Sequence, residues 1–191
     1  MKLYYAPGTC ALASHIALEE AGQPYAIDKL NVPTKTTASG EDFMQINPKG
    51  YVPTIQLDDG SFLTEGAVIL QYIADQHPSA NLAPMLGTMA RYRLQEWLNF
   101  IGSEVHKTYS PMFNKSVAED YKVIARTLLA KRLSYVETQL ANKSYLMGDT
   151  FTIADAYLFT VLRWSERVSF DLKTFKATFY ESLHVPQYKP P

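Results

Sequence analysis

Cys10 is the only cysteine of the chain and the residue with the clearest potential for covalent chemistry. It follows the turn-forming sequence PGT and directly precedes the helical pattern ALASHIALEE. A thiol in the first turn of a helix lies near the positive end of the helix dipole, which favours the thiolate. The competing interpretation is a small hydrophobic side chain buried at a strand–helix junction.

A second candidate site lies between residues 47 and 70. Two short apolar runs, TIQL and SFL, flank the turn sequence DDG, which predicts a β-hairpin. Pro53 opens the first run, where a proline removes no ladder hydrogen bond. We predict a cis bond between Val52 and Pro53, because X-Pro is the peptide bond in which the cis form costs least.

A helix is predicted to begin near Glu65, since apolar residues recur after it at helical spacing. Its free N–H groups can hold a carboxylate, and the strand end beside Pro53 can pair with an extended peptide. A small anionic peptide would fit both features. A carboxylate in the first turn is otherwise ordinary dipole complementation, which would make Glu65 structural.

Asn99, Ser103 and His106 form the third set. Their offsets of 0, +4 and +7 predict one stripe along an α-helix. A polar stripe is also what a solvent-facing helix surface presents, and a single histidine is more often structural than catalytic.

The elements that position these residues fall into two groups. Strands at 2–6 and 25–31, with a helix between them that ends at Gly22, form a parallel βαβ unit. A loop, a short helix and the hairpin–helix segment complete a βαβ-α-ββα order. After a linker at 79–87 the pattern is helical, with helices at 88–109 and 118–142. The first of these is predicted to end at Ser110-Pro111, and Thr152 with Asp155 predicts a structural capping box for the next helix.

Composition narrows the function classes. The 191 residues carry a net charge of −1, so no electrostatic footprint for nucleic acid or an anionic membrane is visible. One cysteine excludes an intrachain disulfide and fits a reducing compartment, and no leader or spanning apolar stretch is present, so the cytoplasm is expected. HExxH, CxxC and Gly-rich phosphate-loop motifs are absent, which gives no support to a metal or nucleotide cofactor.

The motifs together resemble the cytosolic glutathione S-transferases, and most closely their bacterial beta class. The resemblance rests on KLYYAPGTC, NPKGYVP, the hairpin with TEG, and WLNFIGSEVHK, which occur in the family's order across about residues 1–172. It implies a thioredoxin-like glutathione-binding domain at 1–78 and an all-α domain at 88–191 that carries the electrophile pocket. The end of the chain departs from the family, because Pro186, Pro190 and Pro191 oppose a final helix.

The resemblance also assigns roles. Cys10 would hydrogen-bond the glutathione sulfur or form a mixed disulfide with it, and His106 would act near that sulfur. Main-chain groups of Val52 would pair with the cysteinyl part. The remaining implied glutathione contacts are Lys35 to the glycine carboxylate, Glu65 to the γ-glutamyl ammonium, backbone N–H groups of Glu65 and Gly66 to the α-carboxylate, and Asn99, Ser103, Glu104 and Val105 along the border of the site. Many classes have serine where this chain has Gly66, so a hydroxyl donor is missing here.

The expected protein is a homodimeric transferase that adds the thiolate of glutathione, its co-substrate, to hydrophobic electrophiles in detoxification. Two alternatives stay open. The first is thiol–disulfide exchange or peroxidase activity through Cys10. The second is a non-catalytic binding module on the same fold.

Overall fold

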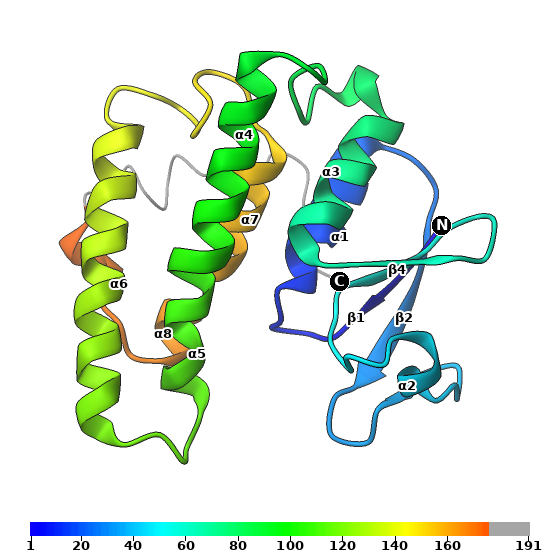
Figure 1. Cartoon of the computed structure of the whole chain (residues 1–191), viewed down its shortest axis with the longest axis horizontal. Helices are drawn as coiled ribbons and strands as arrows, with labels where there is room; N and C mark the ends of the chain where they lie inside the picture. The colour runs from blue at the N-terminus through cyan, green and yellow to red at the C-terminus, as the bar shows by residue number, and fades with distance from the viewer. Residues whose placement is uncertain (176–191) are drawn as a thin grey trace. The chain divides into compact units, whose positions relative to one another are not determined.

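The computed structural model describes residues 1–175, and the expectation for the proline-rich end of the chain lies outside them. The chain divides into two compact units. The first comprises Met1–Ala83 and the second begins at Pro84. The linker predicted at 79–87, with the domain bounds drawn from it, stays a prediction. Figure 1 labels the elements of both units, which are described separately below.

The first unit is built on a mixed five-stranded sheet in the order β3-β2-β1-β4-β5. The β1–β2 pair is parallel and the other pairs are antiparallel. The parallel pair with its connecting helix is the predicted βαβ unit, and β4 and β5 are the predicted hairpin. The strands are β1 (Lys2–Tyr5), β2 (Ala26–Asn31), β3 (Thr36–Thr37), β4 (Thr54–Gln56) and β5 (Phe62–Thr64).

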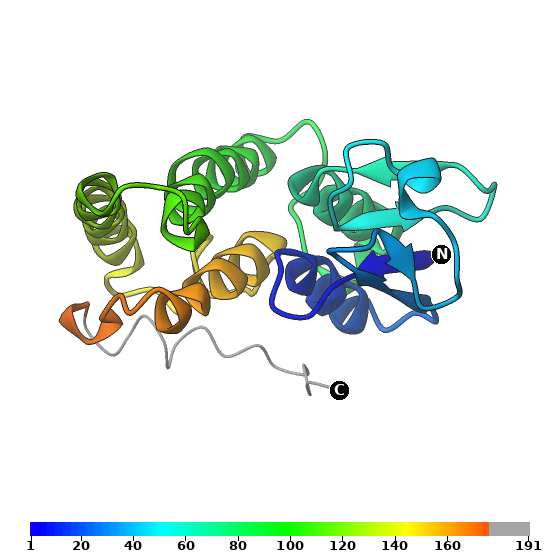
Figure 2. The same ribbon diagram turned by 90° about the horizontal axis from the view of Figure 1, so that it is seen from below.

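Both faces of the central strand β1 are covered. Tyr4 packs with Leu30 and with Phe43, which belongs to the short helix α2 (Phe43–Ile46). Because neighbouring strand residues point to opposite faces, Leu3, which is also fully buried, lies on the other face. Helices α1 (Ala11–Ala21) and α3 (Gly66–Gln76) pack side by side, as both views show (Figures 1 and 2). The order βαβ-α-ββα expected of a thioredoxin-like domain is confirmed.

The second unit is helical. Residues 89–113 form one continuous stretch made of α4 (Met89–Phe100), the π-helical segment η2 (Ile101–His106) and α5 (Lys107–Phe113). The other helical elements are α6 (Glu119–Leu140), α7 (Ile153–Leu162), α8 (Trp164–Arg167) and a short 3₁₀ turn (Leu172–Thr174). The capping box predicted for α7 is present: Thr152 and Asp155 bond each other's backbone N–H groups. None of the helices within residues 1–175 combines the length and apolarity that crossing a membrane requires.

The structure corrects three local predictions. The long helix does not end at Ser110-Pro111, because Pro111 removes only its own backbone donor and α5 continues for two more residues to Phe113. The segment predicted as a loop after β2 contains the two-residue strand β3, which pairs with the end of β2. The third correction concerns η2. A π-helix closes its hydrogen bonds from i to i+5 and turns less per residue than an α-helix, so residues on either side of η2 do not keep α-helical spacing.

Candidate functional site

Cys10 lies at the N-cap position of α1 and is partly exposed. Its Sγ donates a hydrogen bond to the carbonyl oxygen of Val52 at 3.3 Å. In this arrangement the sulfur faces the main chain that precedes the hairpin. The bond between Val52 and Pro53 is cis, as predicted. The cysteine and the strand end recognised separately in the sequence are therefore in contact.

The loop before β4, residues 47–53, is organised by one buried side chain. The amide of Asn47 donates to the carbonyl oxygen of Tyr51 at 2.8 Å and to Oγ1 of Thr54 at 3.0 Å. Its side-chain oxygen accepts the backbone N–H of Lys49 at 3.1 Å, and its carbonyl accepts that of Gly50. Asn47 is only 3% exposed, so these bonds replace water that its polar atoms have lost. They hold the loop in the shape that presents Val52 to Cys10.

Lys35 reaches the same loop from the other side. Its Nζ donates to the carbonyl oxygen of Gly50 at 2.8 Å. The backbone of Lys35 is held at both ends, because its N–H bonds Asn31 and its carbonyl accepts the N–H of Phe43. The lysine that the sequence offered only as a loop residue is thus fixed beside residues 47–53.

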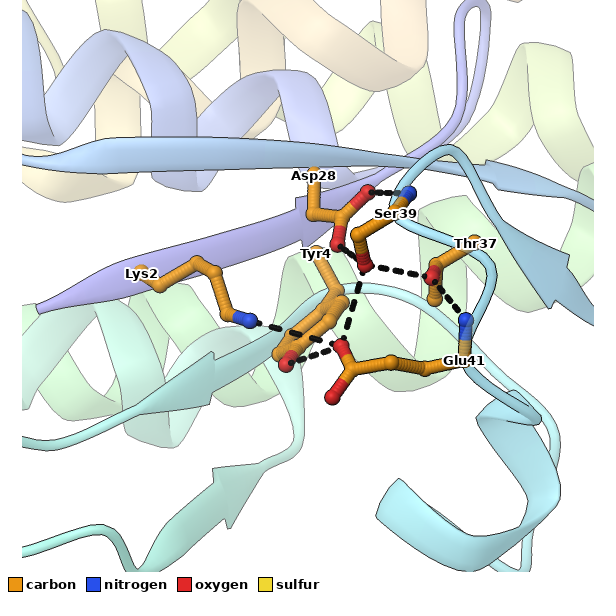
Figure 3. A network of polar contacts seen from close by, with 6 residues as sticks. All are labelled: Lys2, Tyr4, Asp28, Thr37, Ser39 and Glu41. Atoms are coloured by element: carbon orange, nitrogen blue, oxygen red, sulfur yellow. Dashed lines mark hydrogen bonds and ion pairs between the residues drawn. The ribbon is translucent and has the colours of Figure 1, made fainter.

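A polar network fastens the segment that follows Lys35 to the sheet (Figure 3). Ser39 donates from its hydroxyl and its backbone N–H to Asp28 of β2, at 2.6 and 3.3 Å. Glu41 lies within 3.4 Å of Lys2 and of the hydroxyl of Tyr4, both on β1. Glu41 thus meets donors from β1, and Asp28 on β2 meets donors from Ser39. The loop connecting Lys35 to α2 is consequently ordered by side chains as well as by β3.

Glu65 stands immediately before α3 in an unusual backbone conformation. Its φ of 72° and ψ of 111° lie where residues other than glycine are uncommon, and such strain costs about 1–3 kcal/mol and is concentrated at functional sites. Its carboxylate pairs with Nζ of Lys49 at 2.6 Å, and the same Nζ donates to Oγ1 of Thr64 at 3.0 Å. Gly66 follows, and a side-chain carbon there would lie 3.6 Å from Pro53, an ordinary contact distance. The start of α3 and the 47–53 loop are therefore adjacent.

The residues that the sequence places on one face of the helical unit differ in their exposure to solvent and in their contacts. Asn99 and Ser103 are exposed, and the Ser103 hydroxyl donates to the Asn99 carbonyl at 2.9 Å. Glu104 pairs with Arg132 of α6 at 2.6 Å. The side chain of Val105 is fully buried, so a ligand contact by this residue would have to use its main chain.

His106 turns into the helical unit instead of continuing the exposed stripe. Its Nδ1 is 2.8 Å from the hydroxyl of Tyr157 on α7, and its ring packs at 4.7 Å, centroid to centroid, against Trp164. The prediction of a common stripe is wrong because η2 lies between Asn99 and His106 and turns less per residue. Desolvation, with a smaller contribution from the charge of Lys107, lowers the pKa of His106 to about 4. The imidazole is therefore neutral at pH 7.

Sequence reasoning missed four residues that shape these sites: Asn47, Lys49, Tyr157 and Trp164. Asn47 and Lys49 belong to the quoted motif NPKGYVP, so attention to the polar members of that motif would have found them. No local signal marks Tyr157 or Trp164, because their partner is 51 or more residues away along the chain.

Comparison with known proteins agrees with this geometry. Residues 8–76 match the family model of the glutathione S-transferase N-terminal domain, and residues 100–181 match that of the C-terminal domain. The chain is 45% identical to glutathione S-transferase GstA of Escherichia coli O157:H7 over 91% of this chain and 86% of that protein. The chain belongs to the glutathione S-transferase family.

Solved structures extend the likeness to the whole fold. A glutathione transferase from Methylococcus capsulatus is 51% identical to this transferase, with a TM-score of 0.94 over 99% of this chain and 93% of that one. A sphingomonad glutathione S-transferase in complex with glutathione is 37% identical, with a TM-score of 0.89 over 96% and 97% of the two chains. This transferase therefore has the glutathione S-transferase fold, a thioredoxin-like unit followed by a helical one.

Proposed function

We propose that this transferase conjugates the thiolate of reduced glutathione to hydrophobic electrophiles, as a cytoplasmic detoxification enzyme of the bacterial beta class. The observation that carries the proposal is the clustering of Cys10, Lys35 and Glu65 around one loop, in which the bond between Val52 and Pro53 is cis. Glutathione is a short peptide with two carboxylates, one ammonium and one thiol. The loop and the residues around it offer main-chain groups for the peptide, two lysines, one carboxylate and a cysteine.

Each group has a stated task in this proposal. Val52 pairs through its main chain with the cysteinyl residue of glutathione, as in addition of a short strand. Lys35 binds the glycine carboxylate, and Glu65 binds the γ-glutamyl ammonium. The backbone N–H groups of Glu65 and Gly66, at the start of α3, hold the α-carboxylate. The relative shown bound to glutathione supports the choice of ligand.

The chemical step needs the glutathione thiolate, because the thiol is mostly protonated at neutral pH and only the thiolate attacks well. We assign its stabilisation to hydrogen bonds from Cys10 and His106. When Cys10 donates to the ligand sulfur it releases the carbonyl of Val52, which becomes available to the ligand backbone. His106 is neutral at pH 7, so its contribution is that of a hydrogen-bond donor and carries no positive charge. Asn99, Ser103, Glu104 and Val105 complete the proposed glutathione contacts.

The test is direct. Calorimetric titration measures binding of reduced glutathione, and mass spectrometry measures the thioether formed with 1-chloro-2,4-dinitrobenzene. Saturable binding and enzyme-dependent thioether formation are expected. Binding without any turnover across a panel of electrophiles would favour the non-catalytic module, and no binding would refute the assignment of the ligand.

Disulfide exchange is the second candidate, because the Cys10 sulfur is partly exposed beside the same loop. The thiolate of Cys10 would attack the glutathione sulfur of a disulfide between glutathione and a second thiol compound, forming a mixed disulfide with Cys10 and releasing the second compound as its thiolate. A second, reduced glutathione would then restore the Cys10 thiol and release oxidised glutathione. The disulfide supplies the oxidising equivalents of the first step, so no further reactant is required.

The proposal includes a homodimer and a domain assignment. We assign residues 1–78 to glutathione binding, 79–87 to the linker and 88–191 to the helical domain with the electrophile pocket.

Exposed apolar side chains recur on α6 at helical spacing and offer a surface for a second copy: Tyr121, Ile124, Leu128 and Tyr135. Light scattering should give twice the chain mass, and replacing Leu128 by glutamate should lower it. A wild-type chain that is monomeric at micromolar concentration would refute this part.

A further inference from the structure

Lys49 is the cation placed between the two segments that the proposed glutathione site needs. Its backbone N–H is held by buried Asn47, and its Nζ lies 3.0 Å from Oγ1 of Thr64 and 2.6 Å from Oε1 of Glu65. The Lys49 and Glu65 side chains remain 51% and 66% exposed. Lys49 thus reaches from the 47–53 loop to the residue that precedes α3, and its charged end stays accessible to a ligand.

The ligand's charges indicate what this lysine can do. The γ-glutamyl end of glutathione is an α-amino acid head group, with an ammonium and a carboxylate on the same carbon. A group that binds at Glu65 through its ammonium therefore brings a carboxylate within a few ångströms of Lys49. Gly66 offers that carboxylate only its backbone N–H, because glycine has no side-chain donor.

We propose that Lys49 binds the α-carboxylate of the γ-glutamyl residue and supplies the donor that Gly66 lacks. This inference rests on the proposed function and adds a specificity-determining residue to it. A carboxylate has two oxygens, each able to accept more than one hydrogen bond, so Glu65 can keep Lys49 while it receives the ligand ammonium. Lys49, the ligand carboxylate, the ligand ammonium and Glu65 then form a ring of alternating charges.

Two features make the proposal testable by substitution. An ion pair between exposed side chains contributes little to folding, so Lys49→Met is expected to fold normally. At residue 66 a Cβ would meet only Pro53, at 3.6 Å, so Gly66→Ser fits without a shift of the backbone. The serine variant restores the hydroxyl at the place where Lys49 is proposed to act.

The experiment is a calorimetric cycle with two ligands. One is reduced glutathione and the other is γ-aminobutyryl-cysteinyl-glycine, which lacks only the α-carboxylate. Lys49→Met should weaken glutathione binding about tenfold, the size of one charge-assisted hydrogen bond at a partly exposed site, and should leave binding of the analogue unchanged. Gly66→Ser added to Lys49→Met should recover part of the loss for glutathione alone. Lys29→Met, the same change at an exposed lysine of β2, controls for the net charge. It should not change the ratio of the affinities for the two ligands.

The outcomes separate this inference from the proposal beneath it. An equal loss for both ligands would mean that Lys49 only shapes the loop, and would overturn the inference. Tighter glutathione binding by Lys49→Met would also overturn it, because Lys49 would then be a competitor of the ligand ammonium. If the wild-type protein binds glutathione but Lys49→Met does not weaken that binding, the proposed function survives and this inference fails. If the wild-type protein does not bind glutathione, both fail.

Discussion

Protonation of His106 should destabilise the folded protein in mildly acidic solution. Its ring is packed against Tyr157 and Trp164, and its folded-state pKa of about 4 compares with about 6.5 for an unperturbed histidine. In the range between these values the unfolded chain binds the proton more readily than the folded one. Stability is therefore full above about pH 6.5 and falls as the pH decreases towards 4.

The size of the effect follows from the same two values. Proton linkage gives a loss of about 2 kcal/mol between pH 7 and pH 5, which is a large share of a typical domain stability of about 5–15 kcal/mol. His106→Gln removes the titrating group, so its stability should depend less on pH over this interval. Burial also lowers the pKa of His15, but that contribution is common to both proteins and cancels in the comparison.

Urea unfolding at a series of pH values, without glutathione, measures the difference. The wild-type curve should fall more steeply than the variant's, by about 2 kcal/mol in total. NMR titration of the ring protons gives an independent value for the pKa. Parallel stability curves, or an imidazole that titrates near pH 6.5, would refute the assignment of His106 as a neutral, desolvated donor.

Three further predictions concern the glutathione site. Glu65→Ala should weaken glutathione binding by about 1.5–3 kcal/mol and lower the free energy of unfolding by no more than about 1 kcal/mol, since its ion pair is exposed. Calorimetry together with a thermal melt tests this. Unchanged affinity with a large loss of stability would make Glu65 structural. Cys10→Ala should keep glutathione binding and part of the conjugation rate. Intact-mass measurement after treatment with oxidised glutathione should show one glutathione adduct on the wild-type chain and none on the variant. The covalent role is excluded if the wild-type chain never gains that adduct while binding glutathione. Asn47→Ala should destabilise the protein by about 1–3 kcal/mol, because it leaves buried partners unbonded; a melting curve that matches the wild type would contradict its role in ordering the loop.

The sequence predicted those parts of the fold that depend on local chemistry. Gly22 ends α1 in a left-handed conformation, and Thr152 with Asp155 caps α7, because both effects involve residues within one helical turn. The hairpin around Gly60 follows from its positive φ of 84°. In each case the side chains that determine the structure are neighbours in the sequence.

The site was only partly predictable, because the side chains that determine it are far apart in the sequence. The resemblance named Glu65, but its pairing with Lys49 depends on the tertiary contact between the 47–53 loop and the end of the hairpin. The burial of His106 depends on Tyr157 and on a π-helical turn that no local sequence signal predicts. Periodicity assumes regular α-helical geometry, so an error of angle accumulates across η2 and the predicted polar stripe divides.

The π-helical segment η2 also bears on how this helix tolerates changes of length. A π turn holds more residues than an α turn, so one residue could be deleted between Ile101 and His106 and the remainder could close as regular α-helix. Such a deletion would leave the residues after it close to their present direction, because the lower turn per residue across the π segment already offsets the turn of about one α-helical residue, roughly 100°. The imidazole of His106 would then stay beside the hydroxyl of Tyr157. The extra residue is therefore absorbed within this turn, and a homologous helix one residue shorter could still hold a histidine in the place of His106.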